Sequence, residues 1–313
     1  MAARATTSLV VLAALAAGCS DEPGPPRPAA PTSSPASSSA PAPSVPSPAP
    51  RPATFDATTA YAAVEHLAGR IGPRLATDRS FRRAADWAAG RLADAGYDVR
   101  RQRFAVPAGE SWGVSVDAGR SQNVIAEPPG FDPARPHLVV GAHLDTVAVS
   151  PGAEDNASGV GVVLALAGTD LQARLPVVLV LFGAEEPRGP GDDDHHYGSR
   201  HYVARLDEKA RRAVRGMLAL DRVGVGTVVP VGSATAEPPT ALVRAARRAG
   251  VEHVAETGQR SSDHWSFVRA GLPGLRIGST PYAGYHNARD LPGLVDPEQL
   301  DRVGRVVLAW LRG

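Results

Sequence analysis

The chain has 313 residues, and its 33 basic residues nearly balance its 32 acidic ones, so the formal net charge is +1. This balance shows neither the basic excess of a nucleic-acid-binding protein nor an acidic tail. The only cysteine is Cys19, so the chain cannot form an internal disulfide.

Residues 1–19 have the three parts of a secretory signal. Arg4 supplies the positive charge, Leu9 to Ala17 the apolar stretch, and Ala16-Ala17-Gly18 the small-residue cleavage site. The apolar stretch is too short to cross a bilayer as a permanent helix. The segment Leu15 to Cys19 resembles a bacterial lipoprotein signal, which implies a lipid anchor on Cys19 and an extracytoplasmic location at the cell membrane. The alternative is ordinary secretion with an incidental cysteine.

The next segment, residues 20–53, is composed almost entirely of Pro, Ala and Ser. Such a composition lacks the apolar side chains that offset the entropy cost of folding, so it predicts a disordered, extended linker. Residues 54–313 remain, which is long enough for one α/β domain with a sizeable core.

Predicted helices and strands follow one another along this domain. Apolar residues at helical spacing predict helices first, then two strands, and then a strand whose residues are all apolar. The expected ranges are 56–69 and 80–95 for helices and 97–106, 122–126 and 138–141 for strands.

The second half of the domain continues this alternation. Helices are expected at 159–171, 239–249, 262–270 and 297–311, and strands at 177–182, 217–220 and 275–278. The last helix has Asp296 as its cap, and Gln299 is expected to complete a capping box. Because apolar strands alternate with helices, the pattern predicts a single three-layer α/β domain with a mixed, mainly parallel central sheet flanked by helices.

Acidic residues and histidines follow three of the apolar strands. His143 and Asp145 end the first strand, Glu185 and Glu186 follow the second, and Asp221 follows the third. Because ligands collect at the carboxyl ends of strands in open α/β sheets, we expect these side chains to converge. Asp145 lies two residues after His143, where it can accept a hydrogen bond from the ring nitrogen that faces away from a metal. The pattern therefore predicts a metal site.

The neighbouring glutamates indicate how the site is divided between binding and chemistry. Adjacent residues of an extended backbone cannot both face the same point. One of Glu185 and Glu186 can therefore bind a metal while the other faces the substrate as a base. Zinc accepts mixed oxygen and nitrogen ligands and leaves coordination positions open in catalytic sites.

An ordered series of segments is similar to the co-catalytic dizinc aminopeptidase family, which includes the secreted bacterial leucine aminopeptidases and the aminopeptidase Y type. The segments are GAHLDTV, EDNASGVG, FGAEEPRGPG with a later YGSRHY, LALDRVG, SSDHWSFVRAGLPG and YHNARD. Glutaminyl cyclase, plasma glutamate carboxypeptidase and the transferrin receptor share that fold. The resemblance implies a zinc metallo-exopeptidase that hydrolyses peptide substrates and most commonly releases N-terminal residues.

The resemblance also implies roles for individual residues. The implied ligands of two Zn²⁺ ions are His143, Asp155 and Asp221 for one ion, and Asp155, Glu186 and His286 for the other. Glu185 would be the general base. Asp145 and Asp290 would orient the two ligand histidines, and Tyr285 would polarise the substrate carbonyl. A non-proline cis peptide is implied between Asp155 and Asn156.

Other functions stay open on the same fold. Carboxypeptidases and dipeptidases share these ligands, glutaminyl cyclases are expected to lack one metal, and a non-catalytic binding protein is expected to lack ligands or the base. The aminoacylase-type dizinc enzymes insert a whole domain before their last histidine. Asp221 and His286 are only 65 residues apart, which leaves no room for that insertion.

A few remaining residues are assigned to structure rather than chemistry. The acidic segment 187–196 is interpreted as a solvated loop, with an additional metal- or amine-binding edge as the alternative. His264 is expected to support the site from behind. Four further histidines are expected on the surface or in packing contacts: His66, His137, His201 and His253. Three tryptophans are expected in the core: Trp87, Trp265 and Trp310.

Overall fold

The computed structural model describes residues 51–313. The predicted signal segment, Cys19 and most of the predicted linker therefore lie outside the described residues. Within residues 51–313, no helix combines the length and the apolar character that crossing a bilayer requires.

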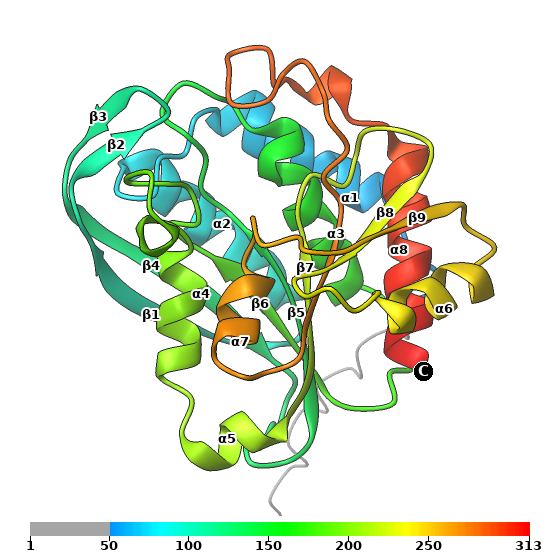
Figure 1. Ribbon diagram of the computed structural model, residues 1–313. Coiled ribbons are helices and arrows are strands. Elements are labelled where there is room, and N and C mark those ends of the chain that lie inside the picture. Colours follow the sequence, from blue (N-terminus) through cyan, green and yellow to red (C-terminus); the bar gives the residue numbers. More distant parts are fainter. Residues whose placement is uncertain (1–50) are drawn as a thin grey trace, which may run out of the picture. The chain divides into compact units, whose positions relative to one another are not determined.

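An eight-stranded sheet runs through the domain in the order β1-β4-β6-β5-β7-β10-β8-β9. The bounds are β1 Asp98–Val106, β4 Gly119–Glu127, β5 His137–His143, β6 Val177–Phe182, β7 Val214–Leu220, β8 Val229–Ser233, β9 His253–Glu256 and β10 Gly274–Ile277. The strands β6, β5, β7 and β10 at its centre are parallel, whereas β1 and β4 pair antiparallel and β8 is antiparallel to β10. The predicted mixed, mainly parallel sheet is therefore confirmed (Figure 1).

Helices cover both faces of this sheet (Figure 1). They are α1 Ala57–Val64, α2 Arg79–Asp94, α3 Gly159–Ala167, α4 Tyr197–Ala204, α5 Glu208–Ala213, α6 Thr240–Arg248, α7 His264–Arg269 and α8 Pro297–Arg312. Alternate residues of β5 point to opposite faces, as a pleated strand requires. Leu138 and Val140 join the core cluster with α1, α2, α3, α6 and α8, and Val139 joins the cluster with α4 and α7. The domain thus has three layers.

The central strands are apolar throughout because both of their faces are covered. Every residue of β5 and β6 is buried, and α3 is buried on all sides between the sheet and α1. Gly161 permits this packing, since a Cβ there would overlap the backbone carbonyl of Ala60. The buried layer holds the strand ends rigidly, which is the condition for a precise site.

Several local expectations differ from the structure. The strands β8 and β9 and the helices α4 and α5 are not in the sequence-based prediction, because their segments are too short to carry a clear periodic signal. The predicted capping box at α8 does not form: Asp296 caps the helix, but the Gln299 amide donates to the carbonyl oxygen of Val228. Trp265 is half-buried rather than in the core, and its indole donates to Asp192.

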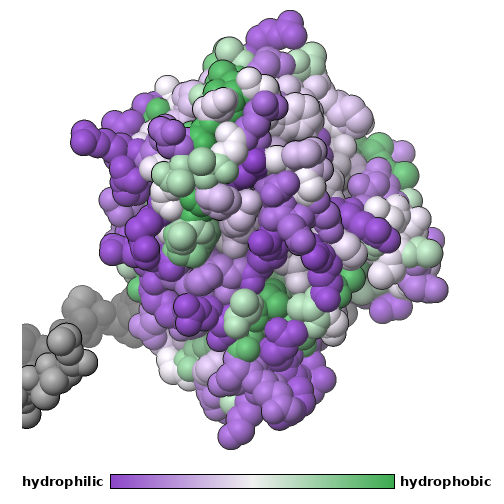
Figure 2. All heavy atoms as spheres, turned by 60° about the vertical axis from the view of Figure 1, so that its left-hand side comes forward, coloured by the Kyte–Doolittle hydropathy of each residue, from purple (hydrophilic) through white to green (hydrophobic). Residues whose placement is uncertain are grey.

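A short antiparallel hairpin stands beside the main sheet. Its strands are β2 Gly109–Ser111 and β3 Val114–Val116, and Trp112 lies at its turn with 56% of its surface exposed. On this side of the molecule the surface is mostly hydrophilic, with apolar areas that are broken up by polar side chains (Figure 2). Single exposed apolar residues are common on protein surfaces, so the exposure of Trp112 alone does not indicate a function. Its neighbours, described below, are more informative.

Candidate metal centre

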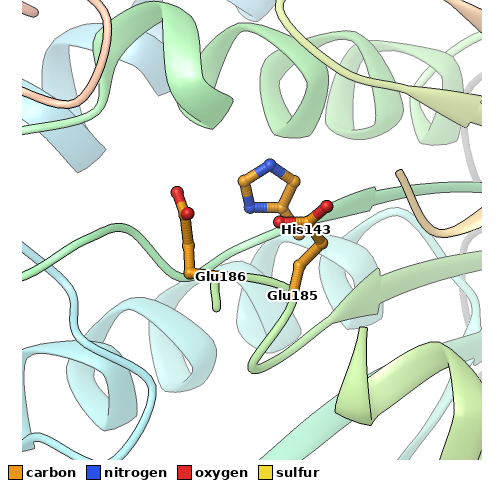
Figure 3. A group of neighbouring side chains, drawn as sticks. All are labelled: His143, Glu185 and Glu186. Carbon is orange, nitrogen blue, oxygen red and sulfur yellow. The ribbon is translucent and has the colours of Figure 1, made fainter. Parts of the chain in front are cut away.

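Three parallel strands deliver acidic and imidazole side chains to one edge of the sheet. His143 is the last residue of β5 and pairs in register with Phe182 of β6. Glu185 and Glu186 follow β6 directly, and their side chains lie beside the His143 ring (Figure 3). Asp221 follows β7. The convergence at the strand ends has the same cause as in other open α/β sheets: each side chain leaves a rigid element at the same edge.

Asp155 joins two groups of side chains, with one carboxylate oxygen in each. Its Oδ1 lies 3.1 Å from His143 Nε2, and its Oδ2 lies 3.0 Å from His286 Nε2. His143 Nε2 is also 3.7 Å from Asp221 Oδ1, and His286 Nε2 is 3.4 Å from Glu186 Oε2. In each group, three donor atoms lie within 4.8 Å of one another. The structure therefore brings all five predicted ligands together.

The His143 ring is oriented by the backbone of Asp145 and has the Asp145 carboxylate nearby. The ring atom Nδ1 lies 3.1 Å from the carbonyl oxygen of Asp145, which leaves Nε2 to face Asp155. The Asp145 carboxylate is 4.0 Å from Nδ1 and accepts hydrogen bonds from the backbone N–H groups of Glu185 and Glu186. Asp145 thus fixes the turn that carries the glutamate pair, and its predicted role in orienting His143 stays a prediction.

Asp290 differs from its predicted role. Its carboxylate accepts hydrogen bonds from the backbone N–H groups of Glu154 and Asp155 at 2.8 and 3.1 Å and from the Tyr282 hydroxyl. Within residues 51–313, no hydrogen bond joins Asp290 to His286, whose Nδ1 has no partner. Asp290 thus holds the backbone at Asp155 instead of orienting the histidine.

The peptide bond between Asp155 and Asn156 is cis, as predicted. The Asn156 side chain ties this turn to the end of β7, because its amide donates to the Leu220 carbonyl at 2.8 Å. Its Oδ1 accepts from the backbone N–H groups of Gly159 and Arg222. These bonds place Asp155 between the two histidines.

A buried arginine that the sequence analysis did not single out secures the chain before Asp155. The Arg74 guanidinium is fully buried and donates to five backbone carbonyl oxygens, those of Leu67, Gly72, Leu144, Pro151 and Gly152. Burial lowers the pKa of Arg74 to about 10, which still leaves it charged at neutral pH. Arg74 therefore joins the end of β5 to the turn that carries Asp155.

The side chains of the two groups are almost wholly buried, and their charges are incompletely compensated by protein. Three of their polar atoms have no hydrogen-bond partner within residues 51–313: Glu186 Oε1, Asp221 Oδ1 and His286 Nδ1. Burial, together with neighbouring carboxylates, raises the pKa of Glu185 and of Glu186 to about 8. Burial alone would lower the pKa of His286, but Glu186 and Asp155 raise it to about 10. The cluster stabilises positive charge at its centre.

These observations are what a divalent cation site requires. Buried carboxylates without partners are costly unless a cation neutralises them. The available donors are imidazole nitrogens and carboxylate oxygens, which suit zinc and similar ions. The unpartnered atoms of Glu186 and Asp221 belong to the residues that the sequence predicts as ligands. The residues present therefore fit a metal centre.

Glu185 has a partner that the sequence analysis did not anticipate. His196 Nε2 lies 3.1 Å from Glu185 Oε1, and the His196 backbone N–H donates to the Glu185 carbonyl oxygen. The segment 187–196 was interpreted as a solvated loop. This holds for Asp193, which is exposed, but not for His196, which is buried with 4% of its surface accessible. No local pattern distinguishes His196 from His195, so only the fold reveals it.

A cavity of about 80 Å³ opens onto these groups, and aromatic rings form part of its wall. The Tyr285 ring stacks on the His286 imidazole with 3.7 Å between centroids, and the Trp112 ring meets the same imidazole edge-on at 4.2 Å. Tyr285 thus lies at the predicted site. Trp112 was not predicted, because its hairpin is remote in sequence from every motif.

The remaining histidines pack elsewhere. His66 stacks on Trp87, His201 packs on Phe104, and His264 is fully buried with Nε2 2.7 Å from the carbonyl oxygen of Gln259. Within residues 51–313, none of them belongs to a group of side chains that could hold a metal ion. His66 and His201 make packing contacts, in line with the expectation for them, and the support of the site by His264 stays a prediction.

Two curated relatives share part of the sequence. Aminopeptidase YwaD of Bacillus subtilis is 30% identical over 208 residues, which is 60% of this chain and 44% of the relative. The probable lipoprotein aminopeptidase LpqL of Mycobacterium tuberculosis is 31% identical over 183 residues, or 51% of this chain and 35% of the relative. The chain thus matches less than half the length of either relative.

Solved structures show the same fold. BSAP, a zinc aminopeptidase from Bacillus subtilis, superposes with a TM-score of 0.72 over 83% of this chain and 95% of its own, at 19% identity. Glutaminyl cyclase of Porphyromonas gingivalis superposes with a TM-score of 0.69 over 82% of this chain and 98% of its own, at 25% identity. Residues 123–311, well over half of the chain, match the profile of Peptidase family M28. The chain therefore belongs to peptidase family M28.

Proposed function

We propose that the protein is a zinc-dependent aminopeptidase that hydrolyses peptides outside the cytoplasm and releases their N-terminal residues. The observation that carries the proposal is the Asp155 carboxylate, whose two oxygens face His143 and His286 at 3.1 and 3.0 Å. Membership of family M28 and the aminopeptidase relatives support the same reaction.

The ligand groups assign the proposed ions. One Zn²⁺ ion would be held by His143, Asp155 and Asp221, and a second by Asp155, Glu186 and His286, because these are the two groups of donor atoms within 4.8 Å that share Asp155. A third group of donor atoms at such distances, His143, Glu185 and Glu186, contains the residue that we assign as the base. Bound in this way, the ions would polarise the scissile carbonyl and lower the pKa of the attacking water.

Glu185 is the proposed general base. Its side chain lies beside the His143 ring but belongs to neither proposed ligand group, so its carboxylate remains free to accept a proton from water. The same oxygen would then deliver that proton to the leaving amine. Asp145 fixes the Glu185 backbone and His196 holds Oε1, so the carboxylate is held in place before the substrate binds.

Tyr285 is proposed to contact the substrate. It lines the cavity and is 38% exposed, and its ring is held by stacking on His286. Its hydroxyl would donate a hydrogen bond to the substrate carbonyl oxygen and stabilise the negative charge that develops there.

The experiment that tests this function uses three substrate types. Purified protein, with and without a chelator and then with added zinc, is incubated with aminoacyl amides, their N-acetylated forms and free dipeptides. We expect cleavage of substrates with a free amine only, loss of cleavage on chelation, recovery with zinc, and about two bound zinc ions per chain by elemental analysis. Cleavage of N-acetylated substrates, or cleavage that resists chelation, would contradict the proposal.

Glutaminyl cyclase activity is the second candidate, because a glutaminyl cyclase shares the fold at 25% identity. The two reactions differ in their products. A cyclase closes the N-terminal glutamine of a peptide into a ring with release of ammonia, whereas an aminopeptidase releases free glutamine. Incubation with a glutaminyl peptide and separate assays for ammonia and glutamine therefore distinguish the two.

Membrane anchoring through Cys19 is part of the proposal and rests on the sequence and on the lipoprotein relative. Full-length chain and a Cys19→Ala variant are expressed in a bacterial host, and the membrane and soluble fractions are compared. We expect the wild-type chain in the membrane fraction and the variant outside it. Equal distribution of both proteins would favour ordinary secretion.

A further inference from the structure

A single arginine stands in the wall of the otherwise acidic cavity. Within residues 51–313, Arg222 is the one Lys or Arg residue that lines the cavity together with the proposed metal ligands. Its side chain is 14% exposed, so it is largely desolvated yet reachable. A desolvated guanidinium is costly unless it has a role in folding or in binding.

Arg222 is held in a defined position. Its backbone adopts a left-handed conformation with φ +59°, and its N–H donates to Asn156 Oδ1 at 3.2 Å. Its guanidinium carbon lies 4.6 Å from the centroid of the Tyr285 ring, and Nη2 donates to Ser279 Oγ at 3.1 Å. Side chains that are held before binding lose little entropy when a ligand arrives, so this arginine suits recognition.

The nearest carboxylate does not need Arg222 as its partner. Asp221 Oδ2 already lies 3.3 Å from Nη2 of Arg276, which is 1% exposed and sits directly behind the site on β10. Arg222 Nε is 3.6 Å from Asp221 Oδ1, beyond ordinary hydrogen-bond distance. Arg276 is therefore the closer counter-charge of Asp221, and Arg222 is a second, more distant one.

Most of the donors of Arg222 are unused. A guanidinium carries five N–H groups, and the bond to Ser279 is its only side-chain hydrogen bond within residues 51–313. None of its nitrogens is among the buried atoms that lack a partner, so the remaining donors are open to the cavity or to solvent. An apolar substrate group would remove water from these N–H donors without offering hydrogen bonds in its place. A carboxylate can accept hydrogen bonds from two neighbouring N–H groups of the guanidinium at once.

We propose that Arg222 binds a carboxylate of the substrate beside the scissile bond, so that the enzyme prefers anionic substrates. This inference rests on the proposed peptidase function and names its substrate class. The carboxylate has two possible sources: the side chain of an N-terminal acidic residue, or the free α-carboxylate of a dipeptide. Either source presents the planar pair of oxygens that a guanidinium recognises.

The test compares substrates that differ in one charge. The first pair is the p-nitroanilides of glutamate and glutamine, coupled through their α-carboxyl groups, and the second pair is leucyl-glycine and leucyl-glycinamide. For the wild-type protein we expect kcat/KM to be at least about tenfold higher for the anionic member of one pair, the value of a charge-assisted hydrogen bond. The pair that shows the preference identifies the source of the carboxylate.

Three variants connect that preference to Arg222. Arg222→Met is expected to lower the ratio of anionic to neutral kcat/KM by about 10- to 100-fold, mainly through KM, and Arg222→Lys to lower it less. Arg289→Met is the matched control, since Arg289 is exposed, lies three residues from His286 and does not line the cavity. Because the ratio is taken within each protein, a reduced folded fraction does not change it.

A second measurement separates this inference from the proposed function. Binding of glutamate and glutamine to wild-type protein and to Arg222→Met is measured by calorimetry, which needs no turnover. Absence of hydrolysis of every substrate would overturn the peptidase function, and tighter binding of glutamate by the wild type alone would still support Arg222. Hydrolysis with no anionic preference in either pair, or a preference that Arg222→Met retains, would overturn the inference. Equal or undetectable binding of the two amino acids, combined with no preference between leucyl-glycine and leucyl-glycinamide, would also overturn it.

Discussion

The two ends of the central sheet differ in what they bury. At the amino ends of β5 and β6 lies a cavity of about 920 Å³, lined by residues 128–132, 135–136 and 169–177 with Arg51 and Tyr97. Its charged residues, such as Asp132 and Arg135, are exposed. At the carboxyl ends, the cavity is about 80 Å³, but the acids and histidines around it are buried.

Desolvated charge, and not volume, therefore distinguishes the carboxyl end of the sheet, which holds the candidate metal centre and is called the reactive end below. Exposed charges at the amino end are screened by water, so their mutual interactions are weak. At the carboxyl end, low dielectric strengthens every interaction among the carboxylates and histidines and makes unpartnered atoms costly. The binding of a cation or a substrate can therefore be much more favourable at the carboxyl end than at the amino end. The following predictions test this contrast, beginning with the largest effect.

Glu185→Gln should remove the proposed base while preserving the shape of the reactive end. We expect kcat to fall by about 10²- to 10⁴-fold, because the amide cannot accept the proton of the water. Elemental analysis should find the zinc content of the variant unchanged, since Glu185 is not a proposed ligand. Activity within tenfold of the wild type would show that another group is the base.

Arg74→Met should destabilise the chain that carries Asp155. Five hydrogen bonds to backbone carbonyl oxygens, three of them buried, would be lost, and we expect the free energy of unfolding to fall by about 3 kcal/mol or more. Urea unfolding measures this change, with Arg289→Met as an exposed control that should shift by no more than about 0.5 kcal/mol. Equal stability of the two variants would mean that Arg74 is not a structural clamp.

His264, buried behind the reactive end, should make stability depend on pH. Burial lowers the pKa of His264 to about 3, below its ordinary value of 6.5, so the unfolded chain binds a proton more readily than the folded one. The stability conferred by neutral His264 is therefore complete above pH 6.5 and is lost as pH falls from 6.5 towards 3, by about 1.4 kcal/mol per unit.

Urea unfolding of wild-type protein and His264→Gln at pH 7.5 and 5.5 checks this sign. Other groups titrate in the same range in both proteins, so the relevant quantity is the difference between them. We expect the wild type to lose more stability than the variant on acidification. The same loss in both proteins would contradict the assignment.

Arg135→Ala should have the smallest effect, because it alters the large cavity at the opposite end of the sheet. Arg135 is exposed there, so we expect unchanged kcat/KM and a stability change within about 0.5 kcal/mol. A substantial loss of activity would refute the functional contrast between the two ends.

The parts of the site that sequence predicts are those attached to apolar strands. His143, Glu186 and Asp221 follow runs that can only be buried strands, and parallel strands bring their ends together. The supporting residues make bonds that the sequence does not predict. The carboxylates of Asp145 and Asp290 accept hydrogen bonds from backbone N–H groups, because a short carboxylate reaches the nearest unpaired donors of a neighbouring turn.

Three residues of irregular segments escaped prediction. His196, Trp112 and Arg222 have no periodic pattern around them that distinguishes them from exposed residues of the same type. The partners of two of them lie far away in the chain: His286 for Trp112, and Tyr285 and Ser279 for Arg222. The partner of His196, Glu185, lies at the other end of the same loop. Contacts at such separations depend on how loops pack over the sheet edge.

The sequence by itself determined the α/β architecture and the order in which acids and histidines leave its strands, because apolar runs and helical spacing are local properties of the chain. Only the tertiary structure decided which atom of Asp155 faces which histidine, which groups hold Glu185, and where a lone arginine enters the cavity. These features depend on ångström-scale distances between distant segments, and such distances are set by packing of the whole domain.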